Sequence, residues 1–198
     1  MAGILENKEL IPSEKAYENN SEYLQDELKR LDLLFQIQIT KELERQPERG
    51  MNPFMGLVVS DEDLLKMLED LRNPIAEESP LQCTNEKIQK LYQVLEKMDA
   101  EITTRRAASL KEGIYLALPY LSQVFQLTRF DEQCILICLA SELDRNYEKV
   151  YSYLQDDVTR KKPSVEWVLK LLCPIRQERL AARMVFDSQA SLLKYGLL

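Results

Sequence analysis

The sequence predicts a mainly α-helical protein, built as a multi-helix bundle. Its 198 residues include only 5 glycines and 8 prolines, and few segments alternate in the way of β-strands. Apolar residues instead recur every three or four positions over long segments, which is the spacing of a helix with one buried face. The composition, 45% hydrophobic and 30% charged, is typical of a folded globular protein rather than a disordered one.

The first predicted helix runs from Ser21 to about Arg45. Asn20 or Ser21 is expected to cap it by accepting a hydrogen bond from a free amide of the first turn. The helix should end before Pro47. Residues 1–20 are polar, and we expect them to form a flexible N-terminus. The apolar stripe of the helix consists of Leu24, Leu28, Leu31, Phe35, Ile39 and Leu43.

Two further helices are predicted before residue 112. Ser60 and Asp63 form a capping-box signature ahead of a short helix that ends at Pro74. The loop 73–84 is the clearest internal boundary. Thr84 is then expected to cap a long helix that reaches about Lys111. The buried stripe of this helix should contain Ile88, Leu91, Tyr92, Leu95, Met98 and Ile102.

The remaining helices follow in short succession after Gly113. Pro119 starts or kinks the first, and a cap formed by Thr128 with Asp131 begins a helix too uniformly apolar to lie at the surface. An amphipathic segment, 147–154, comes next. Ser164 begins another helix, which ends at Cys173-Pro174. Residues 176–186 should be helical, and Ser188 should cap a final turn. We therefore expect an N-terminal helical part, 21–112, and a second helical part, 113–198, which can also share one core.

Charge and cysteine content narrow the classes of function. A net charge of −7 argues against general nucleic-acid binding, because such binding needs an excess of Lys and Arg. It permits docking to a basic patch on another protein. The chain starts without a signal peptide, so its 4 cysteines are expected to be buried, reduced thiols in a cytoplasmic protein. No apolar run approaches the ~20 residues that cross a bilayer.

The sequence contains no recognisable catalytic, cofactor or metal site. No two of its glycines frame a phosphate-binding loop, so we expect this chain not to hydrolyse ATP. It has no histidine, the commonest general base and metal ligand. Cys134 and Cys138 stand four residues apart among apolar neighbours, which makes a poor zinc site. The clusters 61–63 and 156–157 are acidic, but both lie at predicted helix ends, where capping or a solvated turn accounts for them. Glu142 and Asp144 are expected to pair with Arg145 or to cap backbone groups.

The residues that we expect to contact a partner lie between 147 and 167. Arg160, Lys161 and Lys162 would touch phosphate in a helix-turn-helix unit. Yet the exposed positions expected on the next helix (Glu166, Trp167, Lys170) suit base reading poorly, and a salt-bridged surface turn is favoured. The aromatic residues are expected at the core or its edge, and an exposed one would anchor a partner. The candidate partner surface comprises Tyr147, Tyr151, Asp156, Asp157, Arg160, Lys161, Lys162 and Trp167.

A resemblance to a known family centres on residues 139–172, LASELDRNYEKVYSYLQDDVTRKKPSVEWVLKLL. This segment resembles the region ahead of the ATPase module in bacterial and archaeal AAA+ ATPases that are encoded with phage-tail-like extracellular contractile injection particles. Weaker similarities lie in 21–34, in 54–63 (FMGLVVSDED) and in 191–198 (SLLKYGLL), so the resemblance covers most of the chain after about Ser21.

The resemblance implies a winged-helix-like fold for 113–198 and a non-catalytic role. The chain would be the N-terminal partner-recognition, substrate-recognition or assembly domain of such an ATPase, with ATP and Mg held by an AAA+ motor absent from this chain. Its partners would be a protein client, possibly a component of the injection particle, or neighbouring ATPase subunits. The alternative is a winged-helix DNA-binding regulator. The lack of histidines and of glycine-rich turns argues against a small hydrolase.

Overall fold

The computed structural model describes residues 15–45 and 85–198, and within them it confirms the prediction of a mainly α-helical protein. These residues form helices and no strand. In chain order the helices are α1 (Asn20–Arg45), α3 (Glu86–Lys111), α4 (Ala117–Phe125), α5 (Arg129–Leu143), α6 (Asn146–Leu154), α7 (Val165–Leu172), α8 (Arg176–Ala182), the 3-10 helix η3 (Arg183–Phe186) and α9 (Ser191–Lys194).

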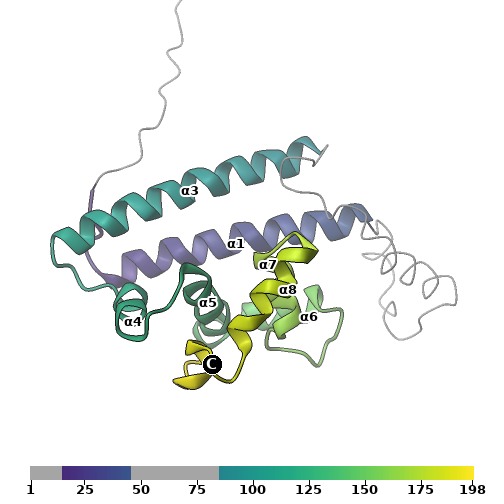
Figure 1. Ribbon diagram of the computed structural model, residues 1–198. Helices are drawn as coiled ribbons and strands as arrows, with labels where there is room; N and C mark the ends of the chain where they lie inside the picture. Colours follow the sequence, from purple (N-terminus) through teal and green to yellow (C-terminus); the bar gives the residue numbers. More distant parts are fainter. Residues whose placement is uncertain (1–14, 46–84) are drawn as a thin grey trace, which may run out of the picture.

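Two long antiparallel helices, α1 and α3, lie side by side, and the shorter helices pack along the other side of α1 (Figure 1). Helix α1 therefore has neighbours on both sides, since it contacts α3 as well as α5, α6 and α7. The predicted extents of both long helices are confirmed. The short helix expected after Ser60 and the boundary loop 73–84 lie outside the described residues.

One hydrophobic core joins the two parts of the chain that the sequence separates near residue 112. Leu31 and Phe35 of α1 and Ile102 of α3 belong to the same buried cluster as residues of the C-terminal helices. A smaller cluster lies between α1 and α3 further along. The C-terminal members of the main cluster are Leu116, Leu118, Cys134, Leu136, Ile137, Ala140, Tyr151, Leu154, Trp167, Val168, Leu171 and Leu192.

The expected flexible N-terminus is wrong for residues 15–20. Tyr17 is fully buried, and its backbone N–H donates a 2.8 Å hydrogen bond to Ser109 Oγ of α3. The Arg105 guanidinium lies over the Tyr17 ring, 3.9 Å from the ring centroid. Because the Tyr17 ring fills a site in the core, the backbone of residues 15–20 is held against α3.

Several helix ends differ by one or a few residues from the expected caps. Asn19 caps α1, because its Oδ1 accepts from the amides of residues 21 and 22 at 2.9 and 3.1 Å, while Asn20 accepts from the Ala117 amide at 2.7 Å. Asn85 caps α3, one residue after Thr84, which lies outside the described residues. The capping box of Thr128 and Asp131 is confirmed. Ser188 does not cap the last turn, which begins after Ala190 without a side-chain cap.

Gly113 turns the chain from α3 into α4. Its φ of +75° lies in the left-handed region that suits glycine. The Ile114 amide donates to the Ser109 carbonyl at 2.9 Å, and the Gly113 amide donates to the Leu110 carbonyl at 3.3 Å. This pair of bonds is a Schellman motif, which satisfies the last carbonyls of α3.

Candidate functional site

The loop between α6 and α7, within the candidate partner surface, is fixed by its own hydrogen bonds. Asp156 adopts a left-handed conformation with φ of +53°. Asp157 Oδ1 then accepts from the Thr159 amide at 2.9 Å and from its hydroxyl at 2.6 Å. Gln155 bridges the base of the loop, since its Nε2 donates to the Lys162 carbonyl at 3.0 Å and its Oε1 accepts from the Ser164 amide at 2.9 Å. The loop is therefore a built turn, as expected for Asp156 and Asp157.

Each basic residue of this loop is paired with a carboxylate, which confirms the expected salt-bridged surface turn. Arg160 Nε lies 3.2 Å from Asp157 Oδ2. Lys161 Nζ lies 3.8 Å from Glu148 Oε2, and Lys162 Nζ lies 3.0 Å from Glu142 Oε1. Glu142 thus pairs with Lys162 and not with Arg145.

The electrostatics of the loop follow from these contacts. Hydrogen bonds from Thr159, followed by the charge of Arg160, hold the pKa of Asp157 below its ordinary value. The hydrogen bond to Glu142 and the charge of that carboxylate raise the pKa of Lys162. Each cation of the loop is opposed by a carboxylate, so the loop presents balanced charge. Val158 lies among these charges with 87% of its surface exposed.

Two aromatic members of the candidate surface belong to the core instead. Tyr151 is fully buried, and its hydroxyl donates to the Ile137 carbonyl. Trp167 is buried too, which corrects its expected exposure on α7. Both rings contact Phe35 of α1, with centroid distances of 5.8 and 5.7 Å. Burial excludes these two side chains from direct contact with a partner.

Tyr147 lies at the edge of the same aromatic cluster, half-buried. Its ring centroid is 5.9 Å from that of Phe35, and its hydroxyl donates a 2.8 Å hydrogen bond to Asp32 Oδ1 of α1. Burial, the hydrogen bond and the Asp32 charge raise the pKa of Tyr147. The interaction ties α6 to α1. The exposed part of the candidate surface is therefore the loop 155–164 together with the rim of α6.

A buried network of charged side chains lies where α1, α3, α4 and α5 meet, and the sequence analysis did not predict it. Arg106 forms two 2.6 Å hydrogen bonds to the carboxylate of Glu132, whose side chain is 2% exposed. Arg129 Nη1 donates to the same carboxylate at 2.9 Å, while its Nη2 lies 2.7 Å from an oxygen of Glu27. The Ser122 hydroxyl also donates to Glu132.

These contacts keep the Glu132 carboxylate charged. Burial alone would raise the pKa of Glu132, but hydrogen bonds from Arg106, Ser122 and Arg129 outweigh burial and hold the pKa below its ordinary value. The network is a structural joint with every carboxylate compensated by arginine. The sequence carries a signal for it: Glu27 falls on the same helical stripe as Leu24 and Leu31.

The three described cysteines are free, in agreement with the predicted reduced thiols; Cys83 lies outside the described residues. Burial raises the pKa of Cys134, Cys138 and Cys173, so the thiols stay protonated and weakly reactive. Among residues 15–45 and 85–198, no group of three or more His, Cys, Asp or Glu side chains is placed to hold a metal ion. In the same ranges, no helix has the length and apolar character to cross a membrane.

A groove of about 500 Å³ lies between α1 and α3. Arg105 lines it and uses its donors internally: Nε bonds the Lys15 carbonyl at 3.2 Å, Nη1 bonds Asp26 at 2.9 Å, and Nη2 bonds Glu22. We therefore interpret the groove as part of the contact between α1 and α3, and not as a ligand site.

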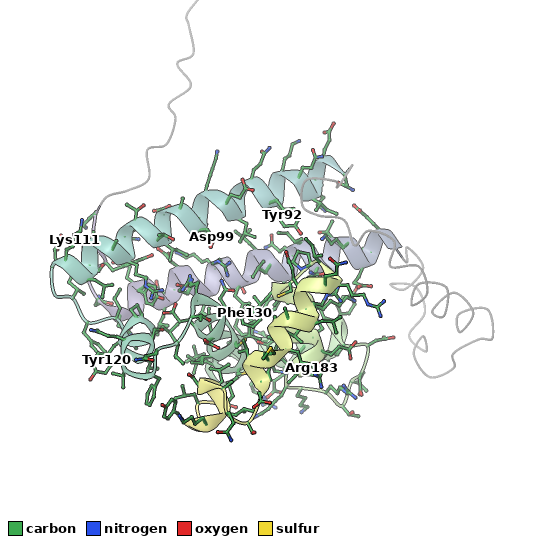
Figure 2. All side chains as sticks on the ribbon, in the orientation of Figure 1. Tyr92, Asp99, Lys111, Tyr120, Phe130 and Arg183 are labelled. Atoms are coloured by element: carbon green, nitrogen blue, oxygen red, sulfur yellow. The ribbon has the colours of Figure 1, made fainter. Side chains whose placement is uncertain are left out.

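Exposed apolar side chains gather at two places that the sequence analysis did not single out. One is α4 with the short segment before it, where Tyr115, Tyr120 and Val124 are exposed. The other is α8 with η3, where Leu180 and Met184 are exposed. Figure 2 shows Tyr120 at one end of the molecule and Arg183 of η3 well apart from it. The first place has a clear signal in the sequence: residues 114–128 include no charged side chain in a chain that is 30% charged.

The sequence model of one family, described as "Winged helix domain, variant", matches residues 6–198. The chain belongs to this family. The match covers both predicted parts of this variant winged helix domain, in keeping with the core that they share. No curated protein and no solved structure matches the chain.

The helix that would read DNA in the alternative function is largely buried in this winged helix domain. A reading helix must present polar side chains to the base edges of the major groove. Helix α7 instead buries four of its eight residues, Trp167, Val168, Leu169 and Leu171. Lys170 Nζ lies 3.2 Å from Glu42 Oε1 of α1, which leaves Val165 and Glu166 as its exposed residues.

Proposed function

We propose that the chain is a non-catalytic domain for partner recognition or assembly, belonging to an AAA+ ATPase of the contractile-injection type. The attribution to this class of ATPase is supported by the resemblance of residues 139–172, described above. The recognition role is supported by the chemistry of the surface. In this reading the domain contacts either an injection-particle component or a neighbouring subunit, while a separate motor module binds ATP and Mg.

The observation that carries the recognition role is the charge-compensated loop 155–164 with an exposed apolar side chain. A phosphate-binding loop needs cations without internal partners, because affinity comes from displacing counterions from phosphates. Arg160, Lys161 and Lys162 are each engaged by a carboxylate instead. Val158 is exposed in a turn held by its own hydrogen bonds, so it can enter an apolar pocket on a partner at little entropic cost.

The test is co-sedimentation of the purified chain with purified contractile injection particles of the same source. We expect the chain to sediment with the particles, and we expect Val158→Asp to reduce the bound fraction by about tenfold. Val158 suits this test better than the basic residues, because reversing a paired cation places two like charges side by side. Leu180→Asp is the matched control: it adds the same charge at another exposed apolar site and should leave binding unchanged.

The alternative, a DNA-binding regulator, draws on the arginines of α8 and η3, of which Arg176 and Arg183 are exposed, whereas Arg179 donates to the Pro174 carbonyl at 3.2 Å. Fluorescence anisotropy with duplex DNA at increasing salt separates the two functions. Binding that weakens steeply with salt, together with no retention on particles, would replace the recognition role by the regulator. We expect no binding to DNA at physiological salt, and no ATP hydrolysis by this chain.

A further inference from the structure

An uncharged strip lies on the exposed face of α4 and beside it. Tyr115 stands just before the helix, Tyr120, Gln123 and Val124 belong to it, and Tyr195 follows α9. Tyr115 is 61% exposed, Tyr120 and Val124 are each 52% exposed, and Tyr195 is 48% exposed. The rings of Tyr115 and Tyr120 contact each other with a centroid distance of 5.4 Å. Tyr195 is joined to α4 through Phe125, with a centroid distance of 5.0 Å. Tyr120, Gln123 and Val124 stand three and four positions apart in α4, so they share one face of that helix.

We infer that this uncharged strip is the interface through which two copies of the chain pair about a two-fold axis. Surface aromatic residues with exposed rings are the side chains that contribute most to protein interfaces. Here Tyr120 lies on α4, Tyr115 just before it and Tyr195 at the end of α9. The inference concerns the chain alone and goes beyond the proposed function.

The charge of the strip favours a second copy as the occupant. In a two-fold interface the same patch meets itself, so any net charge in it is doubled rather than compensated. The chain as a whole carries −7, yet the side chains of the strip carry no charge. Lys194, whose Nζ lies 5.1 Å from the Tyr195 ring centroid, borders the strip at one edge. A partner of opposite charge would find no complementary charge in the strip.

The hydrogen-bonding groups of the strip point to the same occupant. A tyrosine hydroxyl and a glutamine amide each donate and accept, so each can pair with its own symmetry copy. Carboxylates only accept and guanidinium groups only donate, so neither can do this. The polar groups of Tyr115, Tyr120, Gln123 and Tyr195 are all of the self-complementary kind.

Other strongly exposed apolar side chains lack this property. Leu143 stands between Glu142 and Asp144, so a two-fold pairing there would oppose carboxylates. Met184 follows Arg183, whose charge would likewise be doubled. The strip is the surface among the described residues that combines exposed rings with neutral, self-complementary polar groups.

The test is sedimentation velocity of the full chain from about 1 to about 100 µM, a range that covers dissociation constants typical of weak homodimers. We expect dimers at the upper end of this range. Because the contacts are uncharged, the dissociation constant should stay within about twofold when the ionic strength rises. Dissociation of the dimer by salt would contradict a neutral interface.

Two substitutions in the strip test whether the dimer contact lies there. Tyr120→Asp introduces two facing carboxylates per dimer and should weaken dimerisation by at least about tenfold. Val124→Lys should do the same through two facing cations, and it serves as the second variant if Tyr120→Asp fails to fold by circular dichroism. Leu180→Asp is the control, since it charges an exposed apolar site outside the strip and should leave the dimer intact. A chain that stays monomeric throughout the range, or a dimer that survives both strip variants, would overturn the inference.

Discussion

At the scale of single residues, the buried carboxylate of Glu132 has the largest expected consequence for stability. It receives hydrogen bonds from Arg106, Arg129 and Ser122, which come from three different helices. Removing one partner of a buried pair leaves the opposite charge uncompensated, which typically costs more than the pair itself contributes. Glu132 therefore holds together elements that are distant in sequence.

Glu132→Gln is expected to lower the free energy of unfolding by about 3 kcal/mol, because Arg106 loses its charged partner and Arg129 keeps only Glu27. Urea unfolding, followed by circular dichroism and extrapolated linearly, measures the change. Lys90→Ala is the control, since its contact with Glu86 is a 3.9 Å surface pair between exposed side chains and should contribute nothing measurable. Equal stability of Glu132→Gln and wild type would show that the network is not a structural joint.

The same carboxylate predicts how stability depends on pH. The pKa of Glu132 in the folded chain lies below its ordinary value of 4.5, so the unfolded state takes up this proton first as pH falls. The stabilisation is complete above the unfolded pKa and is lost as pH falls through the folded pKa. We expect the free energy of unfolding to decline below about pH 4.5. In Glu132→Gln, urea titrations at successive pH values should show a shallower decline, and an unchanged slope would assign the acid sensitivity to other groups.

Single residues were the hardest features to predict from the sequence. The sequence places Tyr151 and Trp167 in the candidate partner surface and also predicts its aromatic residues at the core or its edge; the cluster around Phe35 buries both, so only the second expectation is confirmed for them. The periodicity of α7 by itself does not predict how much of the helix surface is buried, because burial depends on helices that are distant in the sequence. By contrast, pairing of Arg160, Lys161 and Lys162 was predictable, since acidic residues stand close by in the sequence.

At the scale of helices, local capping signals predict some ends well and others poorly. Thr128 and Asp131 form both bonds of a capping box: the Thr128 amide donates to Asp131 Oδ2 at 2.7 Å, and the Asp131 amide donates to Thr128 Oγ1 at 3.2 Å. Ser188 has the right residue type but the wrong position, because the last turn begins after Ala190. Cap residues are common in loops, so the residue type alone does not fix the end of a helix.

Thr128→Ala is expected to destabilise the chain by about 1 kcal/mol, through loss of the side-chain cap of α5. Ser188→Ala removes the same kind of hydroxyl from a site that caps no helix, and it should change stability by less than about 0.5 kcal/mol. Thermal and urea unfolding of the two variants, measured side by side, give the comparison. Equal effects in both variants would contradict the observed position of the last helix.

Long helices were predicted reliably because their apolar spacing repeats many times. The stripe of α1 recurs from Leu24 to Leu43, and the observed helix ends at Arg45 as expected. Short elements give fewer repeats. The prediction that 176–186 is helical is confirmed, but the division of this segment into α8 and the 3-10 helix η3 does not follow from the sequence pattern.

At the scale of the whole molecule, α1 is the element around which the shorter helices are organised. It lies between α3 and the layer formed by α5, α6 and α7, as Figure 1 shows. Its residues Leu31 and Phe35 complete the core of the C-terminal helices. The predicted division near residue 112 marks a turn at Gly113 and does not separate the core. Sequence composition cannot reveal this, because long-range packing leaves no local signature.

The shared core predicts that the described helices unfold as one cooperative unit. Trp167, the single tryptophan of the chain, reports on the C-terminal helices, while far-UV circular dichroism reports on all helices. The two urea transitions should coincide, as expected for two-state unfolding. Ile102→Ala, on the buried face of α3, should lower both midpoints together, because the cavity lowers the free energy of unfolding by about 3 kcal/mol in a core that both parts share.

The isolated fragment 113–198 should fail to fold, since it lacks the rings and side chains that α1 supplies. Two separate transitions, or a folded fragment with native tryptophan fluorescence, would instead establish two independent domains.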